Sequence, residues 1–544
     1  MDERLPQAEA LAIEGERIKA VGSLDEVRSS IEGEAEWVDL LGRTIIPGFN
    51  DDHIHLLSMG DYFSRPLLGG LTSAEVIAKV AEFYRDAPPG EVLYGQGWDY
   101  PTCPDPHRAL LDRVFTRNPV ALFQYSGHGV WVNSLMLSQL GIDRNAPDPK
   151  GGRIVRDERG EPTGILLDAA AHLAHVRKNA HTLTDHRSRL AHLRESLRLV
   201  REQGITSVQD NTWYPQVVDS LLELEREGQL TLRVSCWADG RAPLRRWRLD
   251  HKRFDEPPAD RREASRYADG PGAMATREAP TLLRLSVEPD LGRGAMITRG
   301  PVKYFLDGTF STRTAWLFEP YLGEAENRGI PMGSPAWIEG IVRSCTRGRR
   351  QAAFHAIGDR AVHELVEGVA AAAALYPWAT RLRMRIEHGQ LIREEDISRI
   401  RDLGMVVSAQ PHALGNPEKD RRLLGEERAD RAYPYRSLLD AGAHLAFGSD
   451  IPGEGSFEPL RAIHNAVNRE SSQRITITEA LRCYTLGSAY AQFKEREKGS
   501  LVPGKLADLA ILSANPLVHP ADSIKEIRVD MTIVGGRIVF DRAV

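Results

Sequence analysis

The sequence predicts an α/β protein built on a TIM (β/α)8 barrel, with a β-sandwich domain from both termini and a long insertion after the first barrel strand. Three observations support this prediction. Short apolar segments alternate with helical segments through the middle of the chain, which is typical of a parallel α/β fold. Eight such segments occur, and eight βα units close into a barrel. Strand-like segments flank this region on both sides.

The predicted barrel strands are short, apolar and separated by segments long enough to contain a helix. They are residues 44–49, 205–209, 232–236, 302–306, 351–355, 384–388, 405–410 and 445–448. An insertion of about residues 57–200 separates the first two strands. We interpret it as a lid over the barrel mouth, because segments at that end of a barrel carry specificity.

The two ends of the chain predict one small discontinuous sheet domain. Their alternating segments are residues 10–14, 17–22, 507–512 and 531–540, the last with a Gly-Gly hairpin turn. We therefore expect a β-sandwich from residues 1–43 and 499–544. Residues 44–498 would then form the barrel domain.

Composition narrows the possible partners and location. A net charge of −6 and a pI near 6.3 give no basic surface for nucleic acid or anionic membranes. No apolar run reaches the length of a membrane span, and the first residues lack the pattern of a signal peptide. The four cysteines are far apart, as in a reduced protein. We expect a cytoplasmic protein that binds neither nucleic acid nor membrane.

His53 and His55 begin a candidate metal site. Side chains two residues apart in a strand point to the same face, so the two imidazoles project together. The other candidate ligands lie on or at the ends of later predicted strands, and they are Lys303, His355, His388 and Asp450. Imidazole-rich sites suit zinc and its late-transition-metal neighbours. A free ammonium would be repelled there, so we expect Lys303 to carry a carbamate able to bridge two metals.

Each of these residues also has a structural interpretation when taken alone. An isolated pair such as His53 and His55 is usually incidental, and a single histidine is usually a hydrogen-bonded core residue. Lys303 could reach solvent, and Asp450 could cap the following helix. All six residues lie at strand carboxyl ends in the right order. This joint placement favours the metal site.

The chain resembles the amidohydrolase superfamily over nearly its whole length. The resemblance is carried by short motifs at residues 52–55, 302–308, 355–360, 386–388, 448–450 and 504–510. Within the superfamily, the chain is similar to N-substituted formamide deformylases of the YtcJ-like branch. The motifs at residues 97–99, 127–134 and 311–315 carry this closer similarity.

The resemblance implies a site for one or two divalent metal ions, most simply zinc. His53, His55 and Asp450 would hold one ion. His355 and His388 would hold the second ion. Carboxylated Lys303 would bridge both ions. A mononuclear site using a subset of the ligands stays open, because the superfamily contains both kinds.

The implied reaction is hydrolysis of an amide-type C–N bond in a small molecule, such as an N-substituted amide or formamide. A metal-bound hydroxide would attack the carbonyl. Asp450 would move the proton from that water to the leaving nitrogen. His128 or His412 would help to polarise the carbonyl. For His412, a loop histidine without any role is an equally good interpretation.

Several aromatic residues could line an apolar substrate pocket or could simply pack in the interior. They are Trp98, Trp131, Phe310 and Trp316. Arg313 could bind a substrate carboxylate, or it could hold the loop after the fourth strand through Glu319.

Two other functions stay open. A metal-dependent deaminase or cyclic-amide hydrolase would use the same site. A non-catalytic binding or regulatory protein could retain the barrel, but the intact ligand set argues against that reading. The resemblance also implies a homodimer.

Overall fold

A computed structural model of the chain describes residues 7–100, 102–124, 129–149, 152–168, 170–174, 178, 183, 185–212, 214–240 and 294–543. These residues divide into two compact units. One unit contains residues 7–56, 196–240 and 294–543, and the other contains the described residues between 57 and 195. Among the described residues, no helix is both long and apolar enough to cross a membrane.

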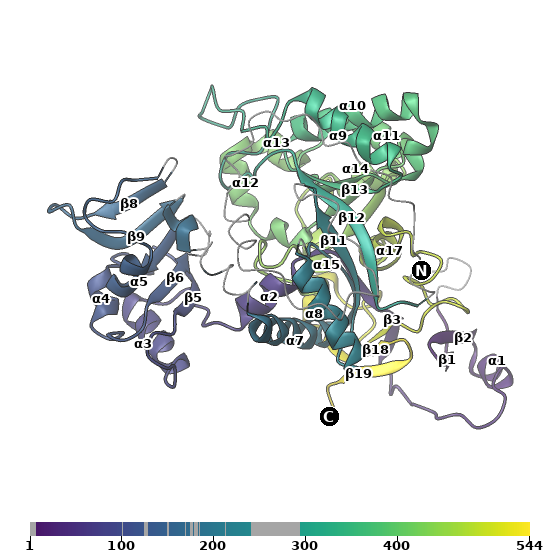
Figure 1. Ribbon diagram of the computed structural model, residues 1–544. Helices are drawn as coiled ribbons and strands as arrows, with labels where there is room; N and C mark the ends of the chain where they lie inside the picture. Colours follow the sequence, from purple (N-terminus) through teal and green to yellow (C-terminus); the bar gives the residue numbers. More distant parts are fainter. Residues whose placement is uncertain are drawn as a thin grey trace. The chain divides into compact units, whose positions relative to one another are not determined.

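The larger unit is built on a parallel eight-stranded sheet that curves into a nearly closed barrel (Figure 1). At the closing edge, the backbone N–H of Asp450 donates to the carbonyl of His53 at 2.6 Å. This architecture confirms the predicted barrel. Its strands, in sheet order, are β4 (Phe49–Ile54), β10 (Ile205–Asp210), β11 (Arg233–Asp239), β12 (Ile297–Phe305), β13 (Ala352–Ala356), β14 (Arg385–His388), β15 (Val406–Ala409) and β16 (His444–Phe447).

Helices follow the strands and pack their apolar faces inward. In α9 (Pro335–Arg347), the N-cap Ser334 accepts from the backbone N–H of Trp337, and Ile338, Val342 and Cys345 form the buried stripe. The remaining helices of this region are α8 (Pro215–Arg226), α10 (Asp359–Leu375), α11 (Glu394–Asp402), α12 (Pro417–Leu424), α13 (Glu426–Arg431), α14 (Tyr435–Asp440), α15 (Pro459–Asn468), α16 (Ile477–Arg482) and α17 (Ser488–Ala491). The helix α7 (His186–Glu202) begins in the smaller unit and enters this one at residue 196.

Short helical segments link several of these elements. They are the 3-10 segments η3 (Pro377–Arg381), η4 (Pro411–Gly415) and η6 (Ala521–Glu526), and the π-helical turn η5 (Cys483–Gly487). The segment η4 directly follows β15, at the end of the barrel where the candidate ligands lie.

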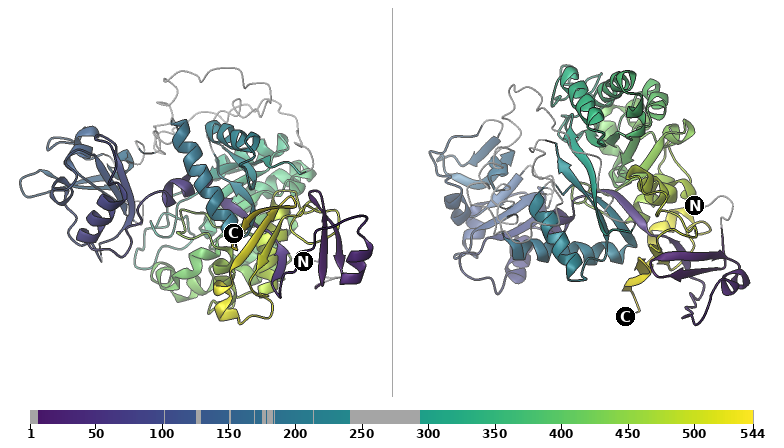
Figure 2. Two further views of the ribbon diagram at one scale, coloured as in Figure 1. Left: turned by 90° about the horizontal axis from the view of Figure 1, so that it is seen from below. Right: turned by 45° about the vertical axis from the view of Figure 1, so that its right-hand side comes forward.

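Strands from both ends of the chain form two antiparallel sheets beside the barrel (Figure 2). One sheet has β1 (Ala10–Glu14) and β2 (Arg17–Gly22), followed by α1 (Leu24–Ser29). Ile18, Ala507 and Leu509 form a shared hydrophobic cluster. The other sheet has the order β19 (Arg537–Asp541), β18 (Val529–Val534), β17 (Leu509–Leu512) and β3 (Thr44–Pro47).

The prediction that residues 44–49 form the first barrel strand is wrong. Thr44–Pro47 pair with β17 in the terminal sheet, and the barrel strand begins at Phe49. The change occurs at Gly48, whose N–H donates to the Asp508 carbonyl, whereas the N–H of Phe49 donates to the Gly204 carbonyl. The apolar run is continuous across this point, so periodicity could not reveal the break. The division into domains at residues 43/44 and 498/499 stays a prediction.

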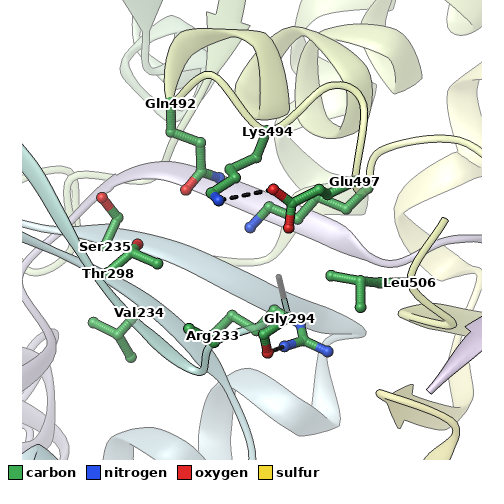
Figure 3. Close-up of a pocket in the computed structure, with 11 residues that line it drawn as sticks. Arg233, Val234, Ser235, Gly294, Thr298, Gln492, Lys494, Glu497 and Leu506 are labelled. Atoms are coloured by element: carbon green, nitrogen blue, oxygen red, sulfur yellow. Dashed lines mark hydrogen bonds and ion pairs between the residues drawn. The ribbon is translucent and has the colours of Figure 1, made fainter. Parts of the chain in front are cut away.

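The amino-terminal ends of the barrel strands carry buried charges that are paired locally. Arg233 at the start of β11 forms two hydrogen bonds to the Asp508 carboxylate, with Nε–Oδ2 at 2.8 Å. Lys494 and Glu497 form an ion pair at 2.8 Å in the adjacent pocket (Figure 3). The buried Lys498 amine donates to the Ser207 hydroxyl on β10. The contacts of Arg233 with Asp508 and of Lys498 with Ser207 join the carboxyl-terminal segment to the bottom of the barrel.

The smaller unit is a mixed five-stranded sheet with two hydrophobic faces. Consecutive residues of β6 point to opposite faces, and Leu122 belongs to one buried cluster whereas Phe123 belongs to the other. The sheet order is β5 (Leu93–Trp98), β6 (Val120–Gln124), β7 (Gly129–Val132), β9 (Pro162–Asp168) and β8 (Gly152–Arg156). Its helices include α3 (Ser73–Phe83), α4 (Arg108–Asp112) and α5 (Ser134–Gln139), and α2 (Leu56–Phe63) leads into the unit. The lid interpretation stays a prediction.

Candidate metal centre

Two histidines and one aspartate lie together where β4 and β16 end. One ligand atom from each of His53, His55 and Asp450 lies within 4.8 Å of the others. Asp450 Oδ1 is 3.5 Å from His53 Nε2 and 3.1 Å from His55 Nε2. Ligand bonds of about 2.0–2.2 Å at tetrahedral angles separate neighbouring ligand atoms by about 3.4 Å. The three residues therefore fit one zinc-like ion.

His355 and His388 lie beside this group at the ends of β13 and β14. Their ring centroids are 4.4 Å apart, and the His53 and His388 centroids are 5.1 Å apart. His388 and Asp450 have positive φ angles, 75° and 53°. Residues other than glycine rarely adopt this conformation, and it often occurs at functional sites. The turn of the backbone at His388 lets consecutive residues, Glu387 and His388, both reach the centre.

Hydrogen bonds fix which ring nitrogens face the centre. Glu387 Oε2 lies 2.6 Å from His53 Nδ1, and Gln410 Oε1 lies 2.8 Å from His388 Nδ1. The ionised carboxylate can only accept, so His53 Nδ1 carries the hydrogen and Nε2 is left with its lone pair. His355 makes this bond through its other ring nitrogen, because its Nε2 lies 3.0 Å from the Gly308 carbonyl. Such bonds commonly orient histidine ligands of metals.

The imidazoles of His53, His355 and His388 are neutral at physiological pH. Burial, with the Lys303 ammonium nearby, lowers the pKa of His53 to about 4. Burial lowers the pKa of His388 to about 3, and that of His355 also falls well below its usual value. Neutral imidazole is the form that binds metal. Burial alone would raise the pKa of Asp450, but His53 and the hydrogen bond from His55 hold it well below its usual range.

Lys303 is buried among aromatic rings close to these ligands. Its Nζ lies 5.9 Å from the Trp237 ring centroid and 5.2 Å from that of Phe305. Burial lowers the pKa of the Lys303 amine to about 8, although the carboxylates of Glu387 and Asp450 act in the opposite direction. A substantial neutral fraction is therefore present near pH 8.

A fully buried layer of charges lies beneath the ligands. The Arg385 guanidinium binds Glu387, with Nε–Oε1 at 2.7 Å, and its Nη2 lies 3.3 Å from Asp52 Oδ2. It also packs on the Trp237 ring at 4.6 Å and donates to the Gln209 side chain. Although burial opposes ionisation, Arg385 and the bond to His53 hold the pKa of Glu387 below its usual range. Arg385 thus keeps Glu387 charged beneath His53.

Glu387→Gln is expected to weaken zinc binding about 10–100-fold, the usual cost of losing such an outer partner of a ligand. The amide keeps the shape of the side chain but removes the charge that polarises His53. Competition with a fluorescent chelator measures the affinity, with the exposed Glu395→Gln as the matched control. Unchanged affinity in the Glu387 variant would contradict this role.

The other predicted site residues differ in their burial and in their partners. His412, in η4, is 7% exposed, and none of the described residues hydrogen-bonds either ring nitrogen. Phe310 is buried after β12, and so is Trp316, under the Arg360 guanidinium. Arg313 is half exposed and pairs with Glu324, so the expected contact with Glu319 is wrong.

Two predicted substrate contacts lie in the interior of the smaller unit. Trp98 donates from Nε1 to the Leu122 carbonyl at 2.7 Å, and it meets Trp131 edge-to-face at 6.2 Å. Both rings are fully buried in one hydrophobic cluster, so their substrate contact stays a prediction. His128 lies outside the described residues.

Sequence reasoning missed the layer of Asp52, Arg385 and Glu387. Two signals for this layer were present in the sequence. The first is that Asp52 and Glu387 are immediate neighbours of His53 and His388. Alternation also places Arg385 and Glu387 on one face of β14. The strand β14 has only four residues, so its alternation is too short to stand out in the sequence.

The comparisons with known proteins agree with this geometry. The model of the amidohydrolase family matches residues 36–540. YtcJ of Bacillus subtilis (strain 168) is 29% identical over 99% of this chain and 97% of its own length. The N-substituted formamide deformylase of Arthrobacter pascens is 28% identical over 100% of this chain and 96% of its own length.

A solved structure supports the same assignment. An uncharacterized metal-dependent hydrolase from Pyrococcus horikoshii OT3 has a TM-score of 0.72 and 25% identity, and the match covers 94% of each chain. The predicted resemblance is thereby confirmed together with the fold. The chain belongs to the amidohydrolase family.

Proposed function

We propose that the protein is a metal-dependent hydrolase that cleaves an amide-type C–N bond in a small molecule, with N-substituted amides or formamides as its substrates. The observation that carries this proposal is the convergence of His53, His55 and Asp450 within 4.8 Å at the end of an amidohydrolase barrel. The substrate class is supported by the similarity to N-substituted formamide deformylase.

We assign the metal ligands as the resemblance to the amidohydrolase superfamily implies. His53, His55 and Asp450 would hold one ion, and His355, His388 and carboxylated Lys303 would hold a second. When bound, the metal lowers the pKa of water and polarises the scissile carbonyl. The carbamate forms when the neutral Lys303 amine adds to CO2 and releases a proton. The buried position and lowered pKa of Lys303 support this step.

Asp450 is the proposed proton carrier. It takes a proton from water at its carboxylate and gives it to the leaving nitrogen as the C–N bond breaks. His412 is the proposed donor to the carbonyl oxygen, because its buried ring nitrogens have no partner among the described residues. His128 has the same proposed role on sequence grounds alone.

Metal analysis of protein purified without chelator tests the proposal. We expect about two zinc ions per chain and an acid-labile mass of one CO2, followed by cleavage of N-substituted formamides to formate and amine. One ion without the labile mass would favour a mononuclear, deaminase-like reaction that releases ammonia. No metal after reconstitution would overturn the catalytic proposal and favour a binding protein. The homodimer and the cytoplasmic location are also proposals, and gel filtration tests the dimer.

A further inference from the structure

Asn211, the residue directly after β10, is buried with its hydrogen-bonding capacity unused. Its side chain is 4% exposed, and neither the amide oxygen nor the amide nitrogen has a partner among the described residues. An asparagine amide can accept two hydrogen bonds and donate two. Buried polar groups without partners are rare and destabilising. The position therefore calls for a partner beyond the residues that the structure describes.

The side chain of Asn211 lies on the inner face of the barrel. Gln209, two residues earlier, accepts a hydrogen bond from the interior Arg385, and alternation along the strand puts Asn211 on the same face. Asp210, on the opposite face, accepts from the backbone N–H of Leu56 instead. Asn211 is thus one layer closer to the carboxyl-terminal end than Arg385.

Asn211 is also level with the metal ligands. Its backbone N–H donates to the Ile54 carbonyl at 2.8 Å, between the candidate ligands His53 and His55. The last paired residues of β10 and β4 are Asp210 and Ile54. The unused amide therefore faces the space into which His53 and His55 project.

We infer that Asn211 is a substrate-binding residue that hydrogen-bonds the amide group of the substrate. This inference rests on the proposed function. A side-chain amide presents a donor beside an acceptor, which matches the N–H and C=O of a secondary amide. Its neutrality also suits a substrate without charge at this point. The unused hydrogen bonds would then be made only when the substrate is in place.

The chain contains a matched control for this residue. Asn50 on β4 is 2% exposed, and both of its amide atoms also lack partners among the described residues. It pairs with Ser207, near the amino-terminal ends of the strands. Three residues of strand, about 10 Å, separate it from His53. Asn50 shares the burial and the unused amide of Asn211 but not its place beside the ligands.

The test compares wild-type protein with Asn211→Leu and Asn50→Leu, all loaded with zinc. Kinetics on an N-substituted formamide are expected to show a KM about tenfold higher for Asn211→Leu, equivalent to about 1.4 kcal/mol. Asn50→Leu should keep the wild-type KM. Metal content should be equal, and neither thermal midpoint should fall, because an apolar isostere replaces an unsatisfied amide. A purely structural role would lower the midpoint.

A second measurement separates this inference from the proposed reaction. An N-substituted N-hydroxyformamide chelates zinc through two oxygens whether or not the enzyme cleaves formamides. Its dissociation constant should be about tenfold higher for Asn211→Leu than for wild type and Asn50→Leu. If wild type binds the analogue in this pattern but cleaves no formamide, the reaction is wrong and the binding role stands. Equal affinity in wild type and Asn211→Leu, or no binding by either, overturns the inference.

Discussion

Asp450→Asn is expected to lower kcat at least about 10³-fold on any substrate that the wild-type enzyme cleaves. The Asp450 carboxylate lies 3.1 Å from His55 Nε2 and 3.5 Å from His53 Nε2. An amide of the same shape cannot take up a proton from water, and it is a weaker ligand than a carboxylate. Initial rates at saturating substrate, measured beside zinc content, separate these two effects.

The matched control for this variant is Asp402→Asn. Asp402 is an exposed residue that pairs with its neighbour Arg401 on α11, far along the chain from any candidate ligand. We expect wild-type kcat and zinc content for the control. The Asp450 variant should keep the wild-type circular dichroism spectrum. Turnover within tenfold of wild type would remove Asp450 from the proton-transfer role.

Asp508→Ala is expected to lower the free energy of unfolding by about 3–5 kcal/mol, the usual cost of breaking one side of a buried ion pair. Asp508 binds Arg233 at 2.8 Å and 3.2 Å and also accepts from the Gly535 N–H at 2.9 Å. Both side chains are buried, so the variant leaves the Arg233 guanidinium without its counter-charge. Denaturant titration followed by circular dichroism measures the change.

A double variant makes this test specific. Replacing both partners, as Arg233→Met with Asp508→Leu, removes the stranded charge and should recover most of the lost stability. Asp522→Ala, at an exposed position of the same terminal region, should change stability little. If the single and double variants are equally unstable, the effect comes from packing and not from the unpaired charge.

The barrel and the candidate ligands at its strand ends were predictable because their signals are local. Each candidate ligand ends or lies on a short apolar strand, and the order of βα units places the strand ends together. These residues are His53, His55, Lys303, His355, His388 and Asp450. The terminal sheet was harder, because β3 and β4 form one apolar run and only its distant partner, β17, divides them. The unused amide of Asn211 depends on burial and missing partners, which no residue pattern contains.

The pairing of β3 with β17 also has a consequence for biosynthesis. Thr44 lies opposite Leu512, so β3 stays without its partner until residue 512 has left the ribosome. At bacterial-like elongation rates this delay is roughly half a minute to a minute and a half. An apolar strand edge exposed for that time invites aggregation. Yield of the folded protein should therefore depend on chaperone supply and on growth temperature during expression.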